Sequence, residues 1–387
     1  MAARPISPAL ISKLLISVAF SAGILAPQAA FADGTRDQVI KIFTDALTAG
    51  GAKSVDQESI TGDDAKFTIA GLDIDDGVED DSFSIDEITF IGAKPTADGG
   101  ISADEIDISG LEIATAKGGT SAKTIKILGF VGAPPAKIKL AGQTHFDSFA
   151  ASEIEGGDDA NSVTLNSLLV TAGDYVNGVP RKGSMELKGL VIPIKADDPQ
   201  MADIVALGYK DFTIDASFKG NWDDKTGRAS LEGLTISAKD AGDVQLAFAI
   251  GGVTPDVVKQ LAAAKGDSNQ TIGILTGLTI ESASLKIGNN SLFERALDQQ
   301  AKKQGTTKEE LLHQGTAMLP MLLTSVQNPA FDKKVMDAVT AFVAAPHSLT
   351  LKIAPAQPVP VGQIIGVAGA APQTLPDVLG ADVSANK

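Results

Sequence analysis

The stretch that decides the fold is Phe67-Thr68-Ile69-Ala70-Gly71-Leu72-Asp73-Ile74, in which apolar residues alternate on both sides of a Gly-Leu pair. The pattern returns at residues 106–113 and 185–192, and in looser form at 229–236 and 277–280. Its glycines, at positions 71, 110, 189, 233 and 277, are 39, 79, 44 and 44 residues apart. A period of about 40 residues predicts one supersecondary unit per repeat, with a degenerate or missing copy near residue 150.

The Gly-Leu pair can be interpreted in two ways. Apolar residues before the glycine have even offsets and those after it odd offsets, so a straight strand would turn the second pair to the opposite face. A bulge with the glycine at positive φ keeps both pairs on one face and bends the strand. The alternative is a tight turn between two short strands. The bulge predicts that Gly233→Val costs more than a few kcal/mol, whereas Glu232→Val is nearly silent.

Period-two alternation dominates residues 51–287, which we expect to form a repeated antiparallel β region. The clearest strands are Phe212-x-Ile214-x-Ala216-x-Phe218 and Val244-x-Leu246-x-Phe248-x-Ile250. Clusters of turn-forming residues lie at 223–227 and 239–242. Residues 209–250 therefore predict a three-stranded antiparallel meander.

Helical patterns flank the β region. Residues 33–50 predict an N-terminal helix that ends at a glycine pair. Residues 288–346 predict a block of three helices, with Thr307 and Asn328 as N-caps of the second and third, and with Pro320 kinking the second.

The last segment, residues 347–387, predicts terminal strands and a proline-rich tail. Residues 348–353 alternate as a strand, and residues 381–385 predict an edge strand. Between them, Pro355, Pro358 and Pro360 predict an extended chain. The fold class is therefore mainly β (α+β): an elongated, curled antiparallel sheet with an N-terminal helix and a C-terminal helical block.

Residues 1–32 have the features of a secretory signal peptide. Arg4 and Lys13 supply the basic region, Leu14–Leu25 the apolar core, and Ala30-Phe31-Ala32 the cleavage signal. No later stretch approaches the roughly 18 consecutive apolar residues that a membrane helix needs. We therefore expect a periplasmic or secreted protein with no transmembrane segment after cleavage.

Composition excludes several classes of function. The chain has 387 residues, of which 44% are hydrophobic and 21% charged, as in a globular protein. It has no cysteine, which excludes disulfides, thiolate catalysis and cysteine-ligated metal centres. Its net charge of −16 argues against nucleic acid as a partner, because phosphate binding needs a basic surface.

Catalytic motifs are also missing from the sequence. The chain contains no G-x-S-x-G, H-E-x-x-H, Walker A or G-x-G-x-x-G pattern. His145, His313 and His347 are far apart in the sequence, and none belongs to a recognisable motif. We therefore expect a protein that is not an enzyme, with no cofactor and no catalytic or metal-binding residue.

One acidic segment surrounds Gly77 with six carboxylates, those of Asp73, Asp75, Asp76, Glu79, Asp80 and Asp81. Calcium prefers such oxygen ligands. The EF-hand register fails, however, because with Asp73 as position 1 Gly77 falls at position 5 and no glutamate lies at position 12. We interpret the segment as a solvated turn at a sheet edge.

One part of the chain resembles known sequences. The stretch starts at Tyr209-Lys210-Asp211-Phe212, continues through Trp222-Asp223, Thr226-Gly227 and Leu231-Glu232-Gly233-Leu234, and ends at Asp240-Ala241-Gly242. It resembles secreted proteins of Gram-negative, especially alphaproteobacterial, bacteria that belong to periplasmic families of unknown function. Their core repeats an aromatic strand, a W-D-x-x-T-G turn, an L-x-G-L strand and a D-A-G turn. The resemblance implies a compartment and a fold, and it transfers no catalytic residue.

The leading functional hypothesis is a non-catalytic envelope protein that binds or shuttles a hydrophobic ligand or lipid. A mean hydropathy of +0.12 requires the apolar surface of a soluble chain to be buried or offered to a partner. A hollow curled sheet would offer that surface, whereas a filled sheet would indicate a scaffold. The expected ligand-lining residues are Phe212, Ile214, Phe218, Val244, Leu246 and Phe248. The alternative is an assembly scaffold of the envelope that binds another protein through its sheet edges.

Overall fold

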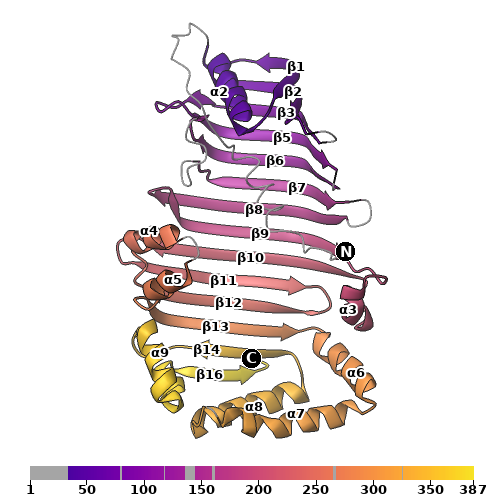
Figure 1. Ribbon diagram of the computed structural model, residues 1–387, viewed down its shortest axis with the longest axis vertical. Coiled ribbons are helices and arrows are strands. Elements are labelled where there is room, and N and C mark those ends of the chain that lie inside the picture. Colours follow the sequence, from indigo (N-terminus) through magenta and orange to yellow (C-terminus); the bar gives the residue numbers. More distant parts are fainter. Residues whose placement is uncertain are drawn as a thin grey trace. The chain divides into compact units, whose positions relative to one another are not determined.

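The computed structural model describes residues 34–78, 81–116, 118–135, 144–158, 162–264, 267–324 and 326–387. The contacts between residues divide the chain into two compact units, Met1–Pro180 and Arg181–Lys387. Strands dominate both units (Figure 1). The predicted signal peptide, residues 1–32, lies outside the described residues.

The N-terminal unit is an antiparallel sheet with one described helix. The helix is α2 (Thr35–Gly50), which confirms the helix predicted at the start of the mature chain. The strands follow chain order in the sheet, except that the two-residue strand β4 (Lys94–Pro95) pairs at the side of β5. They are β1 (Ser54–Gly62), β2 (Lys66–Asp75), β3 (Ser82–Ile91), β5 (Ile101–Thr115), β6 (Gly118–Gly132), β7 (Ser148–Gly157) and β8 (Val163–Val176).

The C-terminal unit is also an antiparallel sheet, and its strands again follow chain order. They are β9 (Val179–Pro193), which starts just before the boundary, β10 (Asp211–Asp223), β11 (Arg228–Ala238), β12 (Gly242–Gly251), β13 (Thr279–Asn289), β14 (Ser348–Ile353) and β16 (Ala381–Ala385). The short strand β15 (Val359–Pro360) pairs with β13. The predicted meander is confirmed as β10, β11 and β12, and the two predicted terminal strands as β14 and β16.

Helices of the C-terminal unit lie between these strands in the chain. They are α3 (Ala202–Ala206) after the 3-10 turn η2 (Pro199–Met201), α4 (Pro255–Ala264), α5 (Ser268–Leu275), α6 (Leu292–Gln304), α7 (Lys308–Leu323), α8 (Pro329–Ala344), α9 (Val361–Ala370), η3 (Pro372–Thr374) and α10 (Leu375–Val378). Both predicted N-caps are confirmed, because Thr307 Oγ1 accepts from the N–H of Glu310 at 3.2 Å and Asn328 Oδ1 from that of Phe331 at 3.0 Å. The predicted class, an antiparallel sheet with an N-terminal helix and C-terminal helices, is confirmed.

Positive-φ glycines bend the strands at the positions that the repeat predicts. Gly71, Gly110 and Gly189 lie inside β2, β5 and β9, with φ of +59°, +62° and +67°. Phe67 and Leu72 are five residues apart, so a straight strand would place them on opposite faces. Both are nevertheless buried, and Gly71 lies between them. The positive φ is therefore confirmed for these three copies, and the tight-turn alternative is wrong for them. An extra residue, as in a bulge, is confirmed only at Gly189, where the register between β9 and β10 shifts. At Gly71 and Gly110 the register continues without a shift, so the bulge interpretation is wrong for those two copies.

The degenerate copy expected near residue 150 lies in β7. Phe149-Ala150-Ala151-Ser152-Glu153-Ile154 matches the repeat with a glutamate in the glycine position, and Glu153 has φ +47°. In the register of the sheet, Lys123 of β6 lies between Gly110 and Glu153, and its Nζ pairs with Glu153 Oε1 at 2.7 Å. The bends of neighbouring strands are therefore aligned across the sheet.

Two later copies of the repeat differ from the prediction. Gly233 lies in β11 with φ outside the left-handed region, and the residue that the β10–β11 register skips is Glu232. Gly277 lies in the turn after α5, where its N–H donates to Ile274 O at 3.2 Å. The prediction that Gly233→Val is strongly destabilising depended on a positive φ at Gly233, and that premise is wrong.

Two segments contain helices where the sequence predicted none. The short helices α3, α4 and α5 interrupt the predicted β region. The proline-rich tail is not wholly extended, because residues 361–370 form α9 directly after Pro360, whose φ is −59°. Proline is compatible with the start of a helix, since its ring holds φ near the helical value and its missing N–H needs no partner there.

Candidate functional site

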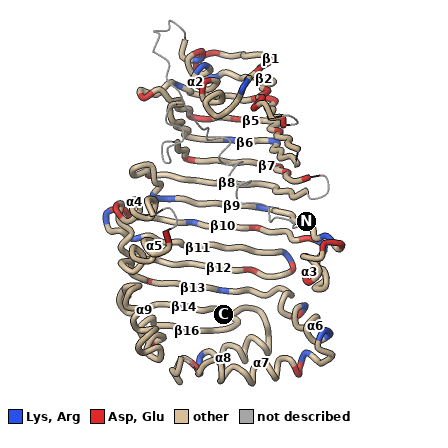
Figure 2. Tube along the Cα trace, viewed as in Figure 1, with Lys and Arg blue, Asp and Glu red and all other residues tan. Residues whose placement is uncertain are grey.

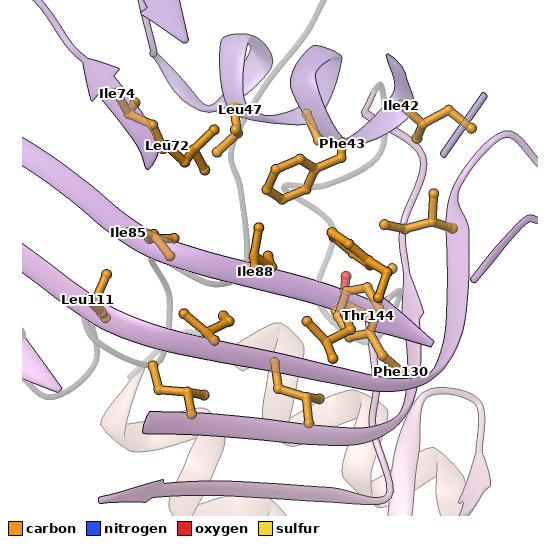
Figure 3. Close-up of a pocket in the computed structure, with 18 of the residues that line it drawn as sticks. Ile42, Phe43, Leu47, Leu72, Ile74, Ile85, Ile88, Leu111, Phe130 and Thr144 are labelled. Atoms are coloured by element: carbon orange, nitrogen blue, oxygen red, sulfur yellow. The ribbon is translucent and has the colours of Figure 1, made fainter. Parts of the chain in front are cut away.

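The apolar sheet face of the N-terminal unit is covered by α2. Figure 3 shows Phe43 and Leu47 of α2 pointing toward Leu72 and Ile88 of the sheet. The Phe43 and Phe90 rings meet edge to face, with centroids 5.5 Å apart. Burial is nearly complete here, with Phe90 only 1% exposed. This part of the molecule is a packed core.

A small cavity of about 90 Å³ remains beneath α2. Thr144 supplies the one side-chain hydroxyl among its lining residues, and none of them is charged. The surface of this cavity is therefore almost entirely hydrocarbon. The apolar stripe that includes Phe43 and Leu47 predicted the helix itself, but it did not predict which sheet face the helix covers.

In the C-terminal unit, no described helix covers the apolar sheet face in this way. Ile236 and Ile287 are 43% and 48% exposed, and Val244 and Leu351 are 40% and 39% exposed. Among the described helices of this unit, Figure 1 shows none across the middle of β10–β14; they lie at the strand ends and beyond β16. Large apolar side chains in the centre of a sheet are normally buried, so this exposure marks the face as a candidate binding surface.

Strand register organises this face into two rows that cross all seven main strands of the unit. One row is Met185, Phe218, Leu234, Leu246, Leu285, Leu351 and Val383. The other is Leu187, Ala216, Ile236, Val244, Ile287, Leu349 and Ala385. We call these two rows the open face. At about 4.8 Å per strand, each row is about 29 Å long.

Charge is absent from the open face and present on the other side of the same strands. The residues next to those of the open face in each strand point to the other side of the sheet. They include the charged Asp215 and Lys219 of β10 and Lys286 of β13, and the polar Gln245 of β12. Successive side chains of a strand point to opposite faces, so the sheet has one hydrocarbon side and one polar side.

Three of the six predicted ligand-lining residues, Phe218, Val244 and Leu246, belong to the open face, and the other three lie on the same two strands outside its two rows. Phe212, Ile214 and Phe218 lie on β10, whereas Val244, Leu246 and Phe248 lie on β12, with β11 between the two groups. None of the six is buried. Sequence analysis missed the continuation of the face onto β13 and β14, where Leu285, Ile287 and Leu351 alternate with polar residues over only a few positions.

Among the described residues, no three Asp, Glu or His side chains lie close enough to hold a metal ion. The rings of His145 and Tyr175 pack at a tilt of 43°, with centroids 4.8 Å apart. The Tyr175 hydroxyl donates to Phe146 O at 2.6 Å, and burial raises the pKa of Tyr175. The Tyr175 hydroxyl is therefore engaged by the backbone of the neighbouring segment.

The described carboxylates of the acidic segment hydrogen-bond to nearby backbone. Asp75 Oδ1 accepts from the N–H of Gly77 at 2.5 Å, and Asp76 Oδ1 from that of Val78 at 2.9 Å. The Lys53 ammonium donates to Gly77 O at 3.1 Å. Glu79 and Asp80 lie outside the described residues. The described part of the segment therefore has the hydrogen bonds of a turn.

Comparison with known proteins matches only the C-terminal part of the chain. A family model described as "Uncharacterized protein" matches residues 235–386. This range runs from β11 to β16 and includes most of the open face as well as α6–α8. No curated protein matches the chain. Among the described residues, no helix is long and apolar enough to cross a membrane.

Proposed function

We propose that the protein binds a hydrophobic ligand, of which the acyl chain of a lipid is the best-fitting class, on the open face of the C-terminal unit. We further propose that it does so without catalysis, in the periplasm or outside the cell, as the signal-peptide pattern of residues 1–32 predicts. The observation that supports binding is an uncharged surface whose central side chains, such as Val244 and Ile287, are 40% and 48% exposed.

The dimensions of the open face favour an extended chain over a compact ligand. Each row is about 29 Å long across the strands. The hydrocarbon core of a bilayer is about 30 Å thick and contains two acyl chains end to end. One acyl chain is therefore shorter than a row and fits along it. Hydrocarbon contact requires no hydrogen bond or charge, and the open face supplies neither.

Native mass spectrometry of protein purified from a Gram-negative host tests this proposal directly. We expect a population of molecules with a bound lipid, which is released by organic solvent. Protein that is ligand-free throughout, and that also fails to bind a fluorescent fatty acid added in solution, would contradict the proposal.

A matched pair of variants tests the location of the ligand. Val244 is on the open face, whereas Gln245, its exposed neighbour in β12, points to the polar side. We expect Val244→Glu to weaken binding of the fluorescent fatty acid by about tenfold or more, because moving a carboxylate from water into contact with hydrocarbon is unfavourable. Gln245→Glu adds the same charge on the other face and is expected to leave the affinity unchanged. Equal affinities for the two variants would place the ligand elsewhere.

A second candidate function, an assembly scaffold, is supported by strand β1. This strand ends the sheet order and pairs only with β2 among the described strands. An open edge of this kind accepts an added strand from another protein. A photo-cross-linker at the exposed Gln57 of β1 tests it in intact envelopes. A reproducible protein adduct that is absent when the cross-linker is placed at Gln300 supports the scaffold, and no adduct at Gln57 contradicts it.

A further inference from the structure

The helix α7 exposes an apolar segment at its C-terminal end. Its residues Met318-Leu319-Pro320-Met321-Leu322-Leu323 form the end of the helix, and we call them the α7 apolar segment. Met318, Met321 and Leu322 are 52%, 62% and 63% exposed. None of the 16 residues of α7 is buried. A helix that is rich in leucine and methionine without a buried residue normally has a partner.

The position of α7 leaves this segment accessible. Helix α8 packs against β16, the last strand of the sheet order, and α7 packs in turn against α6 and α8. Figure 1 shows α7 and α8 beyond β16, with α6 beside the strand ends. Helix α7 therefore lies at the periphery of the unit, in agreement with the exposure of Met318, Met321 and Leu322.

The charge distribution of the helical block points to a lipid surface as the partner. Residues 291–346 contain six basic residues, namely Arg295, Lys302, Lys303, Lys308, Lys333 and Lys334. They also contain six acidic residues, namely Glu294, Asp298, Glu309, Glu310, Asp332 and Asp337. The block is neutral, so the net charge of −16 belongs to the rest of the chain. Anionic lipid repels an acidic protein. Because the helical block is neutral, it can approach a bilayer without that repulsion.

The residue types of the segment also favour lipid over protein. Residues 311–331 contain no charged side chain, and Figure 2 shows α7 without charge beyond its first turn. The segment has no Trp, Tyr or Arg, the residues that dominate affinity at protein–protein interfaces. Leucine and methionine side chains are favourable in hydrocarbon. Since no described helix is long and apolar enough to cross a membrane, we place the contact at the interface between the lipid headgroups and the acyl chains.

We infer that the α7 apolar segment docks the protein on the surface of a lipid bilayer. The contact is hydrophobic and does not depend on anionic lipid. This inference goes beyond ligand binding on the open face and rests on different residues, so either can fail without the other.

Flotation with vesicles tests the inference on the full chain. We expect wild-type protein to float with vesicles of phosphatidylcholine alone, and to do so equally at low and high salt, because a hydrophobic contact is not screened. Met318→Glu with Met321→Glu is expected to reduce the bound fraction by about tenfold or more, since it places two charges in the segment. Gln300→Glu with Gln304→Glu adds the same charge at exposed positions of α6 and is expected to bind like wild type.

A single-cysteine probe reports the contact itself. The chain has no cysteine, so Met321→Cys and Gln300→Cys each place one environment-sensitive dye at a known site. We expect a blue shift on adding phosphatidylcholine vesicles for Met321→Cys only. Fatty-acid binding in vesicle-free solution is measured in parallel, and we expect the Met318/Met321 variant to retain it, which separates docking from the open face. No flotation, equal loss in both charge pairs, or a dye shift that depends on protein concentration without vesicles would overturn the inference.

Discussion

The carboxylate of Asp86 in β3 lies against Gly110 in β5, so that a β-carbon added to Gly110 would be 1.9 Å from Oδ2 and 2.2 Å from Cγ of Asp86. Gly110 also has φ +62°, in the left-handed region. Glycine is therefore favoured here by the backbone conformation, and a larger residue would also have to displace the Asp86 side chain. Gly233, in the corresponding position of a later repeat, has neither constraint, because an added β-carbon would meet nothing within 4 Å.

This difference predicts opposite outcomes for two alanine substitutions. We expect Gly110→Ala to lower the free energy of unfolding by about 1–3 kcal/mol, because it adds a strained backbone and a steric clash. Gly233→Ala, in a strand position with open space, is expected to change it by less than about 0.5 kcal/mol. Urea denaturation followed by circular dichroism measures both. Equal effects would show that the φ of Gly110 does not restrict the choice of residue.

The packed core beneath α2 predicts a large effect for Phe43→Ala. Phe43 is 8% exposed and contacts Phe90 edge to face. Its removal enlarges the existing cavity, and we expect a loss of about 3–5 kcal/mol, as for other buried phenylalanines. Hydrogen exchange of the α2 amides measures the loss locally. Leu292→Ala, at a position that is 43% exposed, is the control and is expected to cost much less. Similar losses for the two variants would contradict the assignment of this core.

The turn at Asp223 predicts a pH-dependent contribution to stability. Asp223 Oδ1 accepts from the N–H groups of Lys225 at 2.9 Å and Thr226 at 3.3 Å. Hydrogen bonds, first from the Thr226 side chain and then from these backbone groups, lower the pKa of Asp223. Because the pKa is lower in the folded state, the stabilisation is present above the unfolded pKa of about 3.9 and is lost as the pH falls through the folded pKa.

Melting temperatures of Asp223→Ala and wild type measure this effect between about pH 7 and about pH 2.5. We expect the variant to melt lower at neutral pH and the gap to narrow as the pH falls below about 4. Asp223→Asn retains an acceptor oxygen for the turn and is expected to fall between the two with little dependence on pH. A gap that is constant across the range would show that ionised Asp223 does not stabilise the fold.

The acidic segment around Gly77 predicts no specific response to calcium. Asp75 and Asp76 hydrogen-bond to backbone within their own turn. We expect calcium chloride and sodium chloride at equal ionic strength to raise the melting temperature equally, because screening acts on both. A rise specific to calcium, abolished by Asp75→Asn with Asp76→Asn, would contradict this and assign a calcium site.

Local patterns in the sequence were sufficient to predict most elements of the fold. Alternation along Phe212-Ile214-Ala216-Phe218 depends on the two-residue period of a strand, and this period predicts both the strand and the face that it offers. The caps Thr307 and Asn328 act on N–H groups within three residues, so they are visible in sequence. The bend at Gly71 was predictable because a change of apolar offset within one strand has few geometric solutions.

Other features depend on what surrounds a residue in space. Gly233 has the same sequence context as Gly110, yet only Gly110 has a positive φ, because glycine permits that conformation without imposing it. Residues 361–370 form a helix although prolines precede them, since those prolines restrict their own φ and not that of the residues that follow.

The candidate site shows the same division between sequence and tertiary structure. By itself, the sequence determined that the strands of both units have one apolar face, because alternation is a property of the chain. Only the tertiary structure decided that Phe90 is covered and Val244 is exposed, at 1% and 40%. The physical reason is that burial depends on a second element: α2 packs over the sheet of the N-terminal unit, whereas the described helices of the C-terminal unit lie at its strand ends and beyond β16.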